Sequence, residues 1–138
     1  DVSSGLKALR DLPFLRRDQD QVMGQQIEAY LDRIGESPPR RFEMDSNQSI
    51  SALVAAGKGW TITTALSLAR AGRFASGIEA HPLPKGDMAR QIVLYATADW
   101  SGGLPEQIAD LARELIGVHF AEPGLERMPW LGNRFRVM

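Results

Sequence analysis

The stretch LVAAGKGWTITT, residues 53–64, carries a glycine on either side of Lys58. Glycine-rich loops with a lysine can hold phosphate groups through their backbone N–H groups. However, Ala52 stands where a P-loop requires its first glycine, and Gly59 stands where it requires Ser or Thr. A dinucleotide fingerprint needs glycines between a strand and the helix after it, whereas these glycines follow a helical pattern. The pair therefore predicts a helix end at Gly57 and a turn at Gly59.

Other residues that commonly carry catalysis or bind metals form no recognisable pattern. The chain has no cysteine, which excludes disulfides and thiolate metal sites. His81 and His119 are far apart in the sequence, which contains neither an HExxH motif nor a GxSxG elbow. Glu106, Asp110 and Glu114 share the polar side of a predicted helix, which is typical of a solvated face. The sequence therefore predicts neither an enzyme nor a bound cofactor or metal.

Polar side chains gather where three predicted strands end, and these are the candidate binding residues. They form three adjacent pairs: Arg16 and Arg17, Ser46 and Asn47, and Thr63 and Thr64. The carboxyl ends of parallel strands meet at one edge of a sheet, where helix N-termini also present N–H groups. Such an edge favours a small anion, such as a carboxylate. Each residue also has a structural alternative, as a helix cap, a solvated strand end or a β-forming residue.

Hydrophobic periodicity predicts the elements that would position these pairs. Three short strands are expected, over residues 12–16, 40–45 and 60–64. Helices are expected between and after them, over residues 18–35, 46–57 and 65–72. Two further strands, over 78–83 and 90–97, precede a strongly amphipathic helix over 104–117 and an irregular tail over 118–138. Alternating strands and helices predict an α/β fold with a mainly parallel central sheet flanked by helices.

Length and charge restrict the class of protein. A chain of 138 residues with 43% hydrophobic residues suits one globular domain. Its 16 basic and 17 acidic residues give no positive excess of the kind that phosphate contacts with nucleic acid require. No apolar run reaches the ~20 residues that span a bilayer, and no signal segment opens the chain. We therefore expect a cytoplasmic protein with no membrane partner and no broad DNA-binding face.

Five segments of the chain resemble the effector-binding domain of LysR-type transcriptional regulators. They are LPFLRR, MGQQIEAYLDRIG, RRFEMDSNQ, LVAAGKGWTITT and LPEQIADLARELI, and the resemblance spans about residues 12–117. The resemblance implies a periplasmic-binding-protein-like fold of two lobes, with a small-molecule effector in the cleft between them. This chain would supply mainly the second lobe, with residues 1–11 as a lead-in from the first. A chain that begins at Asp1 rather than Met is expected for such a piece.

The same resemblance implies partners and a binding edge. It implies self-association as a homodimer or larger oligomer, and contact with DNA only through an N-terminal helix-turn-helix domain outside this chain. Its cleft-facing positions coincide with the three residue pairs identified above. Two alternatives remain: a free-standing solute-binding protein with the same cleft, and an oligomerisation module that binds no ligand.

Overall fold

The computed structural model describes residues 5–86, 88–97, 99–100 and 102–138. The chain divides into two compact units, Asp1–Met88 and Ala89–Met138. This boundary falls inside the segment 12–117 that the sequence predicts as a single lobe. All three residue pairs of the predicted binding edge belong to the first unit.

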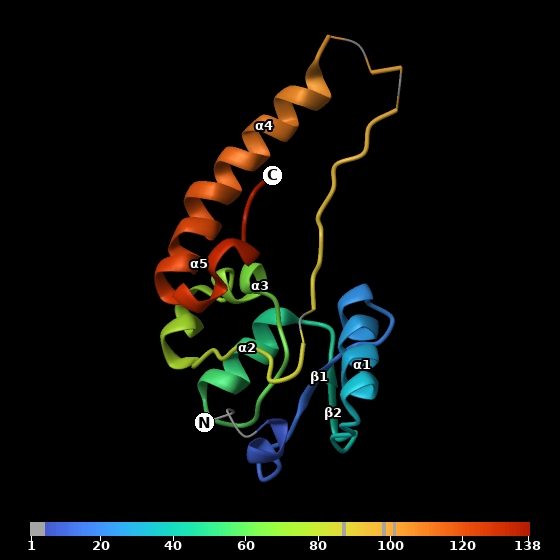
Figure 1. Cartoon of the computed structure of the whole chain (residues 1–138), viewed down its shortest axis with the longest axis vertical. Helices are drawn as coiled ribbons and strands as arrows, with labels where there is room; N and C mark the ends of the chain where they lie inside the picture. The colour runs from blue at the N-terminus through green and yellow to red at the C-terminus, as the bar shows by residue number, and fades with distance from the viewer. Residues whose placement is uncertain (1–4, 87, 98, 101) are drawn as a thin grey trace. The chain divides into compact units, whose positions relative to one another are not determined.

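The first unit is built around a small parallel sheet. Strand β1 (Leu15–Arg17) pairs with strand β2 (Phe42–Met44), so that Leu15 lies opposite Phe42 and Arg17 opposite Met44. Helix α1 (Val22–Ile34) connects the two strands and lies beside them (Figure 1). A strand, a helix and a parallel strand form the crossover unit that the alternating sequence pattern predicts. The α/β class and the parallel direction are therefore confirmed, although each strand has only three residues.

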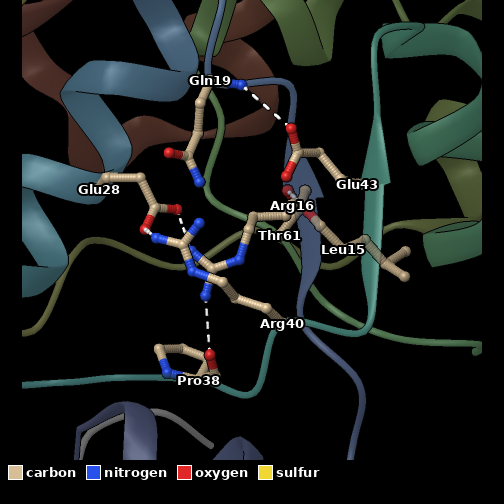
Figure 2. Close-up of polar contacts among 8 residues, drawn as sticks. All are labelled: Leu15, Arg16, Gln19, Glu28, Pro38, Arg40, Glu43 and Thr61. Carbon is tan, nitrogen blue, oxygen red and sulfur yellow. Dashed lines mark hydrogen bonds and ion pairs between the residues drawn. The ribbon is translucent and has the colours of Figure 1, made fainter.

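The third predicted strand is reduced to one parallel bridge between Phe14 and Trp60. The Leu15 N–H donates to the Trp60 carbonyl (2.8 Å), and the Trp60 N–H donates to the Pro13 carbonyl (3.0 Å). The next acceptor in this ladder would be the Leu15 carbonyl, but the hydroxyl of Thr61 donates to it instead, at 2.8 Å (Figure 2). Because that side chain takes the place of a backbone donor, the ladder stops after one bridge.

The core of the first unit lies between α1 and the sheet. It consists of buried side chains from the lead-in, the residue before β1, α1 and the chain after the glycine corner: Leu6, Phe14, Met23, Ile27, Tyr30, Leu31 and Ile62. The α1 members recur at the helical spacing that the sequence predicts. Leu6 belongs to a short 3-10 helix, η1 (Leu6–Leu9), so the lead-in is packed into this unit.

The remaining helices of the first unit follow β2 and the glycine corner. They are α2 (Asn47–Ala55), α3 (Ala65–Ala69) and the 3-10 helix η2 (Gly72–Gly77). The strand predicted over 78–83 is absent from these described residues. Pro82 and Pro84 explain this result, because proline has no N–H to donate to a sheet.

The second unit is helical. Helix α4 (Leu104–Ile116) continues through one π-helical turn, η3 (Gly117–Ala121), into α5 (Glu122–Arg127) and the 3-10 helix η4 (Pro129–Arg134). The predicted helix over 104–117 is thus confirmed. The apolar stripe of α4, formed by Leu104, Ile108, Leu111 and Leu115, is 42–56% exposed.

Two other predictions for the second unit are wrong. Residues 90–97 form no strand, because no described strand pairs with them and apolar composition alone supplies no hydrogen-bond partner. The tail is not irregular, since it contains α5 and η4. Pro123 in the first turn of α5 is compatible with a helix start.

The tail also folds back onto the helices of this unit. The Phe135 ring lies 2.8 Å from where a Cβ on Gly124 would be, and Arg113 Nε donates to the Met138 carbonyl at 2.8 Å.

Candidate functional site

The glycine pair forms a structural corner, as the sequence predicts. Gly57 has φ 69° and its N–H donates to the Val54 carbonyl, while the Lys58 N–H donates to the Leu53 carbonyl, both at 2.9 Å. These two bonds form a Schellman motif, which ends α2. At Gly59, a Cβ would lie 2.5 Å from the Pro13 carbonyl oxygen, so only glycine lets the backbones approach this closely. The corner therefore directs the chain from α2 to the position beside β1.

A shallow pocket lies where the sequence predicts a binding edge. Its polar lining comes from five side chains on β1, α2 and the segment after the glycine corner: Arg17, Asn47, Ser51, Thr61 and Thr63. The pocket encloses a volume of about 20 Å³, which is room for one or two water molecules. A metabolite bound here would therefore be covered on one side by this unit and would extend beyond it.

Arg17 is the cationic side chain of this pocket. Its Nη2 donates to Oδ1 of Asn47 at 2.6 Å, and its Nη1 donates to Oε1 of Gln21 at 3.3 Å. Both acceptors are amide oxygens, and together they orient the guanidinium. The amides are themselves held, because Asn47 Nδ2 donates to the Ser67 carbonyl (3.2 Å) and Gln21 Nε2 to the Asp45 carbonyl (3.1 Å). The network joins the end of β1 to the starts of α1 and α2.

Ser46 and Thr64 have the capping role that was the structural alternative for them. Ser46 Oγ accepts a hydrogen bond from the Ser49 N–H (3.2 Å) at the start of α2. Thr64 Oγ1 accepts from the Ser67 N–H (3.1 Å) at the start of α3, and its hydroxyl donates to Ser67 Oγ at 3.1 Å. These oxygens satisfy N–H groups that have no partner within the helix. Both residues flank the pocket lining without belonging to it.

Arg16 lies apart from the other five predicted residues. Successive side chains of a strand point to opposite faces, so Arg16 points away from the pocket that Arg17 lines. Arg16 is 3% exposed and pairs with Glu28 of α1, while its Nη2 donates to the Pro38 carbonyl at 2.7 Å (Figure 2). Arg40 approaches the other Glu28 oxygen at 3.6 Å. In this position Arg16 ties β1 to α1, which is a structural role.

The sequence interpretation missed part of the pocket wall. The side chains it overlooked are mainly apolar: Ile50, Val54, Ile62, Leu68 and Ile78. Two polar side chains, Ser51 and Thr61, were also overlooked. One signal was available, because Asn47, Ile50, Ser51 and Val54 follow the i, i+3, i+4, i+7 spacing of one helix face.

The described residues offer no group of three or more His, Cys, Asp or Glu side chains able to hold a metal ion. Across the described chain, none of the helices is both long enough and apolar enough to cross a membrane.

Comparison with known proteins identifies the family of the chain. The family described as LysR substrate binding domain matches residues 3–115. No curated protein and no solved structure gives a match. The match covers most of the 138 residues and includes the pocket, the glycine corner and α4. The domains of this family belong to regulatory, non-enzymatic proteins. The chain therefore belongs to the LysR substrate-binding domain family.

Proposed function

We propose that this chain is the effector-sensing part of a LysR-type transcriptional regulator, and that Arg17, Asn47 and Thr63 contact a small anionic metabolite. The observation that carries the proposal is the pocket where these three side chains meet, at the carboxyl edge of parallel strands. A guanidinium held by neutral amides suits a carboxylate, because its donors are oriented before the ligand arrives. Ser46 and Thr64 support this edge by capping the helices beside it.

The small enclosed volume supports a site that a second lobe completes. A drug-sized ligand is normally buried over most of its surface, in a cavity of ~300 Å³ or more. The roughly 20 Å³ enclosed here is far below that size. In the proposed mechanism, the effector bridges this unit and the other lobe and stabilises the arrangement that it contacts best. The resulting change in transcription is exerted in the cytoplasm by a helix-turn-helix domain outside this chain.

Titration with acetate tests the anion contact on the chain itself. We expect weak, saturable chemical-shift changes at the Asn47 side-chain amide and the Thr63 N–H in a nitrogen–proton correlation spectrum. Arg17→Gln removes a charge-assisted contact worth about 1.5–3 kcal/mol and raises the acetate Kd about 10- to 100-fold. Arg10→Gln is the matched control, because Arg10 is exposed and lies outside the pocket. Shifts that are unchanged in Arg17→Gln would contradict the proposal.

Two further observations test the regulatory part of the proposal. A helix-turn-helix encoded upstream of residue 1 in the same reading frame is the expected result, and a secretion signal there would favour a solute-binding protein. Light scattering should give the mass of a homodimer or a larger oligomer. An oligomer whose pocket resonances respond to no carboxylate would instead favour an oligomerisation module.

A further inference from the structure

Ser51 places a buried hydroxyl group in the wall of the pocket. The residue belongs to α2, is 7% exposed and lines the pocket with its side chain. Within the part of the chain that the structure describes, no residue forms a hydrogen bond with this hydroxyl. A serine hydroxyl can both donate and accept, and burying one without a partner is unfavourable. Ser51 is therefore able to bind a polar group that enters the pocket.

The other polar side chains of the pocket are either hydrogen-bonded or exposed. Asn47 uses both ends of its amide, one of them to accept from Arg17. The Thr61 hydroxyl donates to a backbone carbonyl of β1, and Thr63 is exposed. Ser51 differs from these four residues because it is buried and has no hydrogen-bond partner among the described residues.

The enclosed space limits the size of the group that can reach Ser51. A volume of about 20 Å³ admits a group as small as a water molecule, and a hydroxyl has that size. Ser51 follows Asn47 by one helical turn on the same face of α2, so their Cβ atoms are ~5–6 Å apart. One small ligand can therefore contact both side chains, with a carboxylate beside Asn47 and a hydroxyl beside Ser51.

We infer that the effector is a short hydroxycarboxylate whose hydroxyl group, on the carbon next to the carboxylate, is hydrogen-bonded to Ser51. This inference rests on the proposed function, because it assigns a ligand class to the site where Arg17 and Asn47 contact the carboxylate. An acid with a methyl group in place of the hydroxyl displaces water from Ser51 without replacing its hydrogen bond. A site that bonds a ligand hydroxyl rejects such an analogue, because its own polar group is left unpaired.

Glycolate and propanoate are matched probes of this contact, because they differ only in whether the carbon next to the carboxylate carries a hydroxyl or a methyl group. We expect glycolate to bind about five- to tenfold more tightly, measured from the shifts of the Asn47 side-chain amide and the Ser51 N–H. Ser51→Ala should weaken glycolate binding until the two acids differ less than about twofold. Ser49→Ala is the matched control and should keep the preference, because Ser49 is exposed on the same helix outside the pocket lining.

Unfolding by urea separates a ligand contact from a structural role of Ser51. Ser51→Ala should leave the free energy of unfolding unchanged or raise it, because the hydroxyl has no partner to lose and alanine favours a helix. A clear loss of stability in this variant would show that the hydroxyl bonds within the fold, and it would overturn the inference.

The binding outcomes distinguish this inference from the proposed function. Equal affinity for glycolate and propanoate, or tighter propanoate, with both lost in Arg17→Gln, would overturn the hydroxyl contact and leave the anion site intact. A glycolate preference that persists in Ser51→Ala would overturn the assignment to Ser51. If neither acid shifts the resonances of Asn47 or Thr63 at any concentration tested, the proposed site itself fails.

Discussion

Oδ1 of Asn47 accepts a 2.6 Å hydrogen bond from the Arg17 guanidinium, and this contact joins the start of α2 to the end of β1. Because Asn47 Nδ2 also donates to the Ser67 carbonyl, both polar atoms of the amide are engaged. The amide therefore orients the guanidinium at the pocket. The proposed anion site depends on this orientation.

Replacing Asn47 with aspartate tests whether the neutrality of this support matters. Asn47→Asp keeps the side-chain shape but places a carboxylate beside Arg17, so the guanidinium forms an internal ion pair and loses attraction for an external anion. We expect the acetate Kd to rise about tenfold, measured by the same spectral titration. Gln48→Glu is the matched control, since it adds the same charge one residue further along, on a side chain that is exposed. Equal losses in the two variants would mean that general repulsion, and not the Arg17 contact, controls binding.

Removing the hydroxyl of Ser46 tests its assignment as a helix cap. Ser46→Ala leaves the Ser49 N–H without its acceptor and should lower the free energy of unfolding by about 1 kcal/mol. Denaturant unfolding gives this value, while the acetate titration should be unchanged. Ser49→Ala leaves the backbone N–H and the Ser46 cap in place and serves as the control. A large loss of acetate affinity in Ser46→Ala with no loss of stability would instead assign Ser46 to the ligand.

The Arg16–Glu28 pair should contribute to stability and not to binding. Glu28→Gln leaves the buried Arg16 guanidinium without its counter-charge and should lower the free energy of unfolding by roughly 3 kcal/mol. Arg40→Gln removes only the outer, exposed partner of Glu28 and should cost less than about 1 kcal/mol. Both values come from urea unfolding. Comparable small losses in the two variants would show that Arg16 does not depend on Glu28.

The two glycines of the corner should differ in their response to alanine. Gly59→Ala forces a Cβ to within 2.5 Å of a backbone carbonyl, so the chain must shift at a cost of roughly 3 kcal/mol. Gly57→Ala meets no atom within 4 Å and costs only the strain of a positive φ, about 1–2 kcal/mol. Thermal unfolding of both variants gives the comparison. A larger loss at Gly57 would contradict the close approach of Gly59 to β1.

Local patterns predicted the helices and the first two strands of the first unit, because these elements depend mainly on neighbouring residues. The spacing of apolar residues shows the α1 stripe, and glycines mark the helix ends at Gly35 and Gly57. The alternation of strands and helices indicates the parallel direction of β1 and β2. The strand predicted over 90–97 failed for a different reason. A strand requires a pairing partner, and the periodicity of one segment contains no information about whether that partner exists.

The candidate site was predictable as an edge but not as a set of side chains. The sequence brought Arg17, Asn47 and Thr63 together because parallel strands end on the same side of a sheet. It could not separate Arg16 from Arg17, because the alternation along a three-residue strand depends on where the strand begins. The apolar wall was missed because residues such as Ile50 are equally typical of a buried helix face.

A crystal structure of this chain grown with acetate tests the central claim most directly. We predict density for the carboxylate within hydrogen-bonding distance of the Arg17 guanidinium and the Asn47 amide. Acetate density elsewhere on the chain, with none beside Arg17, would contradict the proposed anion site.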